Sequence, residues 1–265
     1  MSRTYVITGT ASGIAAATAK LLTEAGHKVI GVDIHDADIV ADLSTKEGRL
    51  EAANRAIELS GGKIDAVIAC AGLAHPIPTT VSVNYFGMTE FLDALAPTLA
   101  KSDAPRAVLI SSMASLMPND PALVEAMFTD DDETKALARA QELVDIGGGM
   151  EQLIYASTKR AISRWVRREC IKPQWAGAGI PLNAIGPGIV RTPMVADMIA
   201  TEEARAALDS QVPMPLNYYL EPENVAHLLI WLASVENTHV TGQTIYIDGG
   251  SDAVLRGDNV WDLAD

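Results

Sequence analysis

Cysteine is scarce in this sequence of 265 residues, and histidine offers no metal-ligand pattern. The two cysteines, Cys70 and Cys170, lie far apart in the chain, so neither a disulfide scaffold nor a CxxC zinc site is supported. We expect both to be buried thiols. The five histidines show no spacing typical of metal ligands, so no bound metal is expected.

Long apolar runs and positive charge are also lacking. No uninterrupted apolar stretch approaches the length of a membrane span, and Met1 to Thr4 contain no apolar signal core. We therefore expect a cytoplasmic protein without a membrane partner. Lysine and arginine number 20 against 34 aspartates and glutamates, which gives a net charge of −14. Such a chain repels phosphate backbones, so no nucleic-acid partner is expected.

Apolar side chains, by contrast, are abundant. Hydrophobic residues make up 48% of the chain and charged residues 20%, enough for a large core, and one domain spanning 1–265 is expected. Strand and helix patterns alternate, which predicts a doubly wound α/β fold with a parallel sheet of about seven strands and helices on both faces. Residues from about 118 to 150 break the alternation and are interpreted as a helical insertion. Strands are expected at 5–7, 29–32, 38–42, 66–69, 107–110, 182–185 and 244–247, and helices at 14–25, 47–59, 80–100, 151–171 and 224–233.

A glycine turn separates the first strand from the first helix. Gly9 and Gly13 can bring backbone N–H groups and a helix N-terminus close to a pyrophosphate, although an ordinary strand-to-helix turn would look similar. Asp33 lies 20 residues beyond Gly13, at the end of the second strand, where a carboxylate can accept hydrogen bonds from a ribose diol. An aspartate there is also a common turn former. Because the carboxylate would repel a 2′-phosphate, NAD(H) is favoured over NADP(H).

Tyr155 and Lys159 are four positions apart on one expected helix, so both side chains project from the same face. An ammonium beside a phenol favours the phenolate and would lower its pKa toward the range useful for acid/base catalysis. Ser112, at the carboxyl end of a strand, would place a hydroxyl near the same reacting oxygen. Asn84 lies in an otherwise apolar helix, where its amide needs partners and a structural role remains open.

Taken together in this order, these elements resemble the short-chain dehydrogenase/reductase family, whose fold is a Rossmann domain. The resemblance implies that Tyr155 is the acid/base, that Lys159 also binds the nicotinamide ribose, and that Ser112 orients the carbonyl. Asn84 would hold a water molecule that links Lys159 to solvent. Asp42 and Leu43 would flank the adenine, and Ile189 and Thr192 would contact the nicotinamide end. The implied cofactor contacts are Gly9, Ser12, Gly13, Ile14, Asp33, Asp42, Leu43, Cys70, Ala71, Gly72, Tyr155, Lys159, Pro187, Gly188, Ile189 and Thr192.

Several segments, including 41–45, 82–87 and 248–250, resemble the bacterial 3α-hydroxysteroid dehydrogenase/carbonyl reductases within that family. This resemblance implies a hydroxysteroid, ketosteroid or smaller aryl or alicyclic ketone as substrate. It also implies a homodimer formed through the C-terminal helix and strand, because the insertion would cover the surface used in tetramers, although a tetramer stays open.

Two departures from the family pattern stand in the cofactor region: Ala15 replaces a third glycine, and Cys70 stands where asparagine is typical. Met194, Met198 and Ile199 are expected either to line an apolar pocket or to pack in the core. A different class of function also remains open, in which the chain is a non-catalytic dinucleotide sensor that binds a protein partner.

Overall fold

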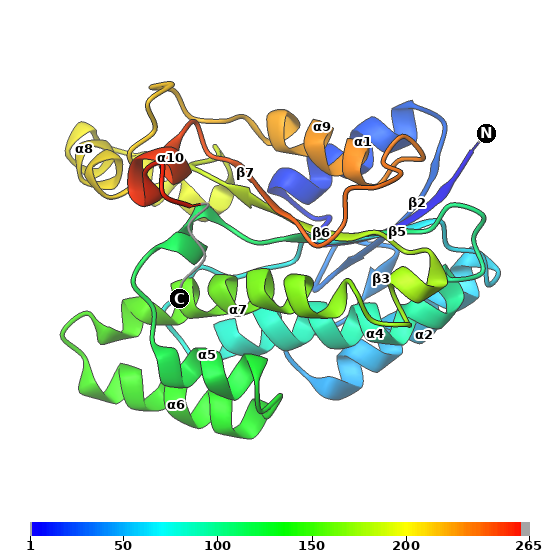
Figure 1. Ribbon diagram of the computed structural model, residues 1–265, viewed down its shortest axis with the longest axis horizontal. Helices are drawn as coiled ribbons and strands as arrows, with labels where there is room; N and C mark the ends of the chain where they lie inside the picture. Colours follow the sequence, from blue (N-terminus) through cyan, green and yellow to red (C-terminus); the bar gives the residue numbers. More distant parts are fainter. Residues whose placement is uncertain (1, 261–265) are drawn as a thin grey trace.

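The computed structural model describes residues 2–260, which form one seven-stranded parallel sheet flanked by helices (Figure 1). The strand order is β3-β2-β1-β4-β5-β6-β7, the Rossmann arrangement expected from the sequence. The strands are β1 (Thr4–Thr8), β2 (Lys28–Asp33), β3 (Ile39–Val40), β4 (Ala66–Ala69), β5 (Arg106–Ile110), β6 (Leu182–Pro187) and β7 (Thr244–Ile247). The helices are α1 (Gly13–Glu24), α2 (Lys46–Ser60), α3 (Thr79–Val81), α4 (Gly87–Leu99), α5 (Pro121–Phe128), α6 (Glu133–Ile146), α7 (Leu153–Glu169), α8 (Glu202–Gln211), α9 (Pro222–Leu232) and α10 (Ser251–Arg256).

The sheet lies between two layers of helices. Helices α1 and α9 pack together on one face, while α2, α4 and α7 cover the other (Figure 1). The central strands β4, β5 and β6 are buried along their whole length, as their near-continuous apolar sequences require in a parallel sheet covered on both sides. Strand β7 is the half-buried edge. No helix within residues 2–260 is both long and apolar enough to cross a membrane.

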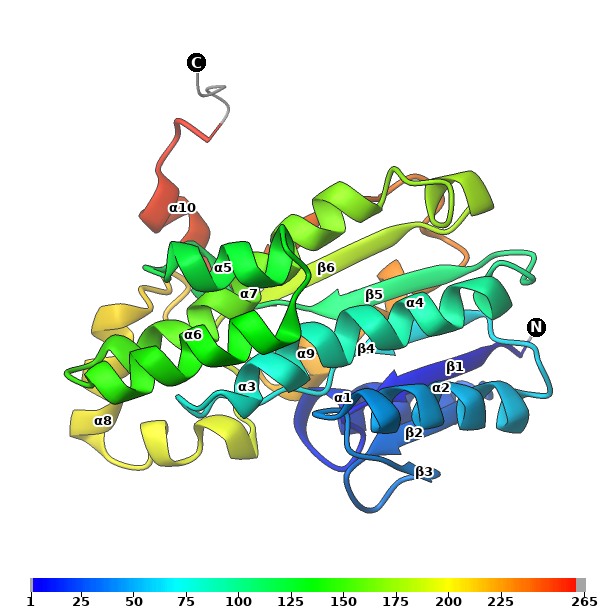
Figure 2. The ribbon, with the colours of Figure 1, turned by 90° about the horizontal axis from the view of Figure 1, so that it is seen from below.

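The segment between β5 and α7 adds an outer layer. Helix α5 packs on α7, and α6 packs on α5, so the pair lies outside the main helical layer (Figures 1 and 2). Both helices have an aspartate N-cap: Asp120 accepts from the Leu123 N–H at 2.7 Å, and Asp132 accepts from the Lys135 N–H at 3.0 Å. Asp132 belongs to the acidic run 130–133, so this run contributes the N-cap of α6.

Two local predictions need correction, and one helix has no counterpart among the predicted elements. The third strand is only Ile39–Val40 rather than 38–42. The helix expected over 80–100 is divided by a π-helical turn, Ser82–Phe86, between α3 and α4. Helix α10 was not predicted, because its six residues are too few to show a helical period.

Candidate active site

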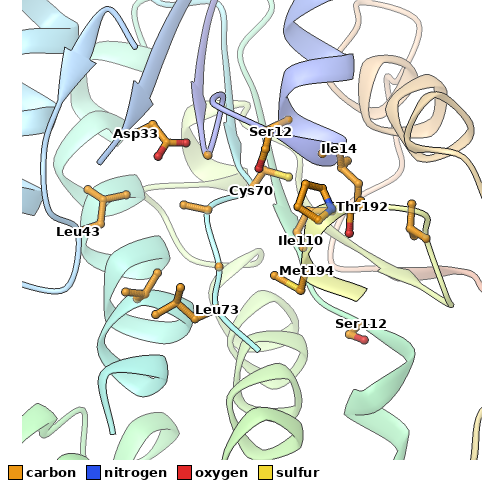
Figure 3. Close-up of a pocket in the computed structure, with 18 of the residues that line it drawn as sticks. Ser12, Ile14, Asp33, Leu43, Cys70, Leu73, Ile110, Ser112, Thr192 and Met194 are labelled. Atoms are coloured by element: carbon orange, nitrogen blue, oxygen red, sulfur yellow. The ribbon is translucent and has the colours of Figure 1, made fainter. Parts of the chain in front are cut away.

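A cleft of about 430 Å³ opens at the carboxyl ends of the parallel strands, the usual ligand position in such sheets. Every residue predicted to contact cofactor or substrate lines it except Asn84 and Ile189. Figure 3 shows Asp33 and Leu43 toward one end and Ser112 toward the other. Ala15, which the sequence places in the cofactor region, also lines the cleft. The sequence did not point to these further lining residues: Ile34, Ala41, Ser44, Leu73, Thr79, Val83, Ile110, Ser111, Val190, Pro193 and Val195.

The glycine turn brings bare backbone to the cleft. Gly9 has a φ of +85°, and a Cβ there would lie 2.9 Å from the Ala71 Cα, so a side chain is excluded by both conformation and space. Gly13 has a φ of +58° and begins α1. The Ser12 side chain does not cap this helix and its first turn holds no acidic residue, which leaves the N-terminus available for an anion. Ala15 is 2% exposed, so its extra methyl packs into the core.

Asp33 is fixed across the glycine turn. Its Oδ2 accepts a hydrogen bond from the Ala11 N–H at 2.9 Å, and its Oδ1 accepts from the Ile34 N–H at 2.7 Å. The carboxylate is thus held at the end of β2, facing the cleft. Lys159, near Tyr155, is the one cation among the described residues that line the cleft.

Tyr155, Lys159 and Ser112 come together where α7 passes the end of β5. Lys159 Nζ lies 5.6 Å from the centroid of the Tyr155 ring and donates to the Ile110 carbonyl at 3.1 Å. The Ser112 hydroxyl lies near enough to the Tyr155 phenol to lower its pKa, and Ser112 Oγ accepts from the Ala114 N–H at 3.1 Å. The phenol, the ammonium and the strand-end hydroxyl that were predicted to meet around one reacting oxygen therefore share one end of the cleft.

The acidity of the phenol differs from the prediction. Burial raises the pKa of Tyr155, and the nearby Ser112 hydroxyl only partly offsets this. Burial lowers the pKa of Lys159 to about 8, since its side chain is 2% exposed. The ammonium, directed at a backbone carbonyl, does not produce the expected low phenol pKa.

Asn84 is fully buried and supports the site by hydrogen bonds to two neighbouring segments. Its Oδ1 accepts from the Leu73 N–H at 2.8 Å, and its Nδ2 donates to the Leu73 carbonyl at 2.9 Å and to Thr158 Oγ1 at 3.2 Å. A Cβ at Gly72 would lie 3.2 Å from Asn84 Oδ1 and 3.7 Å from Lys159 Nζ, so all three residues meet closely. The amide thus joins the segment after β4 to α7. The water link implied by the family resemblance stays a prediction.

Three other predictions are resolved by burial. Ile189 is 5% exposed and packs with Met113 and Val212 rather than lining the cleft. Met194 does line it, whereas Ile199 packs against the Ile189 cluster. Cys170 is buried, but the expectation for Cys70 is wrong, because Cys70 is only half-buried and borders the cleft.

No group of three or more potential His, Cys, Asp or Glu metal ligands occurs within residues 2–260. The chemical groups in the cleft are instead a phenol, an ammonium, hydroxyls, a thiol, two carboxylates and exposed backbone amides. These can bind an anionic, ribose-containing ligand and exchange a proton with it or with a neighbouring molecule.

Comparison with known proteins points the same way. The family described as short chain dehydrogenase matches residues 3–124, and that described as Enoyl-(Acyl carrier protein) reductase matches residues 141–252. The chain is 38% identical to the 3-alpha-hydroxysteroid dehydrogenase/carbonyl reductase of Comamonas testosteroni, over 95% of this chain and 97% of that protein. The crystal structure of the 3-alpha-hydroxysteroid dehydrogenase from Pseudomonas sp. B-0831, complexed with NADH, aligns with a TM-score of 0.87 at 37% identity, over 96% of this chain and 99% of that one. Levodione reductase, at 23% identity and a TM-score of 0.73 over 95% of this chain and 98% of that one, shares the fold.

Proposed function

The chain belongs to the short-chain dehydrogenase/reductase family, and from this membership we propose that it is an NAD(H)-dependent oxidoreductase that interconverts a secondary alcohol and a ketone. The observation that carries the proposal is the meeting of Tyr155, Ser112 and Lys159 at one end of a cleft. Asp33 and the glycine turn stand in the same cleft, so one elongated ligand can reach both sets of groups.

The cleft residues fit a nicotinamide dinucleotide. A side chain at Gly9 would clash with the Ala71 backbone, and one at Gly13 would crowd the Thr192 side chain, so this part of the cleft is lined by bare backbone. The uncapped start of α1 offers N–H groups to a pyrophosphate. The related Pseudomonas enzyme is complexed with NADH. When bound here, the cofactor would supply or accept the hydride.

The choice of NAD(H) over NADP(H) is supported by charge. Asp33 would accept from the adenosine ribose hydroxyls, and Asp42 and Leu43 would border the adenine. The Asp33 carboxylate would repel a 2′-phosphate placed beside it. Within the described part of the chain, the one cation that lines the cleft is Lys159, which lies near Tyr155 and could not neutralise that phosphate.

Proton transfer would fall to Tyr155. In reduction, its hydroxyl would donate a proton to the substrate's carbonyl oxygen, and in oxidation the phenolate would take the proton from the substrate's alcohol. Ser112 would donate to the same oxygen and hold it beside Tyr155. Lys159, protonated below about pH 8, would stabilise the phenolate and bind the nicotinamide ribose.

The substrate is proposed to be a hydroxysteroid or ketosteroid, with a small aryl or alicyclic ketone as the second candidate. The name of the Comamonas relative supports both, since it covers steroids and carbonyl compounds. Apolar side chains from both walls, among them Leu73, Val83 and Met194, would face such a molecule.

We further propose one domain with an insertion at about 118–150, a cytoplasmic location and a homodimer, with a tetramer as the alternative assembly. The dimer is supported by the half-buried edge strand β7 and by Trp231 and Val235, which are 39% and 53% exposed. An open sheet edge and exposed apolar side chains are both suited to pairing with a second copy.

The deciding experiment is a spectrophotometric NADH-oxidation screen across ketosteroids and small ketones. We expect turnover of at least one ketone, lost by about a hundredfold or more in Tyr155→Phe while NADH still binds. Tyr218→Phe, which changes an exposed phenol outside the cleft, is the matched control. Full turnover in Tyr155→Phe would show that Tyr155 is not the acid/base. NADH binding by the wild-type protein with no turnover of any ketone would instead indicate a dinucleotide sensor.

A further inference from the structure

Arg49, on α2, is a buried cation outside the cleft. Its side chain is 1% exposed, and its guanidinium lies 5.8 Å from the centre of the Phe86 ring. Moving a guanidinium out of water is costly unless all its N–H groups find acceptors. The partners of Arg49 therefore indicate what this residue is built to hold.

Two of these partners form part of the cleft wall. Arg49 Nε donates to the Leu43 carbonyl at 2.8 Å, and Nη2 donates to the Ser44 carbonyl at 3.1 Å. Leu43 and Ser44 both line the cleft, and Leu43 stands at the same end as Asp33 (Figure 3). Arg49 thus holds the backbone of the cleft wall at Leu43 and Ser44 by two hydrogen bonds, without lining the cleft itself.

The opposing charge comes from the outer helical layer. Glu133, the first residue of α6, accepts from Arg49 Nη1 at 2.7 Å and from Nη2 at 2.6 Å, a two-pronged pair. Glu90 on α4 adds a longer contact to Nη1 at 3.2 Å. Arg49 lowers the pKa of Glu133 despite the opposing effect of burial, so this pair is ionised at neutral pH. Glu133 is the principal counter-ion.

We propose that Arg49 and Glu133 are positioning residues for the dinucleotide, through which the helical segment between β5 and α7 holds the Leu43–Ser44 wall of the cleft. This inference rests on the proposed NAD(H) function. It gives that segment a role at the cofactor site, although the cleft is lined by no residue from α5 or α6. Glu133 fixes the Arg49 guanidinium, and the guanidinium in turn fixes the Leu43 and Ser44 carbonyls.

Loss of the Glu133 charge would act on the wall rather than on the reacting groups. Among the described residues, Glu90, whose side chain is 36% exposed, would be the one remaining carboxylate partner, beside the Ser82 carbonyl at 3.3 Å from Nη2. The guanidinium would shift toward Glu90 and toward water. The hydrogen bonds to Leu43 and Ser44 would then weaken. Tyr155 and Ser112 make no contact with this pair, so the proton-transfer geometry would stay as it is.

The test compares Glu133→Gln with Glu142→Gln, the same change on the same helix at a residue that pairs with Arg139. NADH dissociation constants are measured from the fluorescence of bound NADH, and kcat is measured at saturating NADH with a ketone found in the screen. We expect Glu133→Gln to raise the NADH dissociation constant about tenfold and to leave kcat within about twofold. Arg49→Lys keeps the positive charge but cannot make the two-pronged contact of a guanidinium, so it should also raise the NADH dissociation constant. Glu142→Gln should match the wild type.

Folded Glu133→Gln with wild-type NADH affinity, or with a lower kcat and unchanged affinity, would overturn the inference. Circular dichroism and a melting curve establish that each variant is folded. If Glu133→Gln does not fold, Glu133→Asp, which keeps the charge but cannot span both nitrogens equally, decides by the same measurement. A wild-type protein that fails to bind NADH would contradict the proposed function itself.

Discussion

Lys159 Nζ is tethered to the carbonyl of Ile110, 3.1 Å away at the last residue of β5. Ser111 and Ser112 follow directly, so the same strand end that fixes the ammonium also presents the hydroxyl next to Tyr155. Ser111 strengthens the connection, because its Oγ donates to the Lys159 carbonyl at 3.1 Å and lies 2.8 Å from Ser163 Oγ. Helix α7 and strand β5 are therefore fastened together at the reacting groups.

Lys159→Met should stabilise the cofactor-free protein while lowering turnover about a hundredfold or more. Burial lowers the pKa of Lys159 to about 8, so the ammonium is less favourable in the folded state than in the unfolded chain. The penalty is fully present below about pH 8 and fades as pH rises toward about 10.5, the unfolded value. We expect urea unfolding at pH 7 to show a gain of about 1–2 kcal/mol, reduced by the lost bond to Ile110.

The control for this change is Lys20→Met on α1, where the side chain is 70% exposed and no gain is expected. A Lys159→Met protein less stable than the wild type at pH 7 would contradict the burial penalty. The difference between variant and wild type should also narrow in alkaline solution, which separates a charge effect from better packing.

The two reaction directions should respond oppositely to pH. Because burial raises the pKa of Tyr155, the phenol remains protonated at neutral pH, the form needed to donate in ketone reduction. Plots of kcat/KM should be flat for reduction between about pH 6 and 8 and should rise with pH for alcohol oxidation. In Tyr155→Phe, the residual kcat/KM for alcohol oxidation should no longer rise with pH. Reduction that accelerates with increasing pH would show that another group donates the proton.

Much of this architecture follows from local sequence. The apolar strands β1, β4, β5 and β6 are identifiable because each is a short apolar run followed by a turn or a polar residue. Residues at the carboxyl ends of strands, such as Gly9 after β1, Asp33 in β2 and Ser112 after β5, are expected in the cleft because parallel strands share one carboxyl edge. Spacing along a single helix then added Tyr155 and Lys159.

What the sequence could not give depends on contacts between distant segments. The π-helical turn that carries Asn84 has no pattern of its own, since one extra residue in a turn leaves the apolar period almost unchanged. The raised Tyr155 pKa reflects burial, which spacing does not reveal. Ile189 follows the predicted loop but turns into a small cluster with Met113 and Val212, a consequence of packing against the segment near α8.

Asp33→Asn should weaken the preference for NADH over NADPH about tenfold or more. The amide oxygen can still accept from one of the two backbone N–H groups, so the turn is expected to persist while the charge that repels a 2′-phosphate is removed. The measurement is kcat/KM with each cofactor. Asp36→Asn is the matched control, because Asp36 follows the same strand at 91% side-chain exposure and does not line the cleft. An unchanged cofactor ratio in Asp33→Asn would remove Asp33 from this role.

Asp120→Asn should destabilise the protein through the two-helix segment. Arg139 donates to both carboxyl oxygens of Asp120, at 3.0 and 2.7 Å, and thereby fastens α6 to the start of α5. Asparagine can still cap α5 at the Leu123 N–H, so the variant isolates the ion pair. Since the Arg139 side chain is 28% exposed, a loss of about 2 kcal/mol in the free energy of unfolding is expected rather than the full cost of a buried pair.

The pH dependence gives the sharper test of this pair. Arg139 lowers the pKa of Asp120 below its usual range, so the stabilisation is present above about pH 4 and is lost as pH falls through the lowered value. Urea unfolding of wild type and Asp120→Asn should therefore differ at pH 7 and converge in strong acid. Asp145→Asn, which alters an exposed carboxylate bonded to Gln141 on the same helix, should follow the wild type throughout. A constant gap between wild type and Asp120→Asn down to acid pH would mean that packing, and not the ionised carboxylate, fastens α6 to α5.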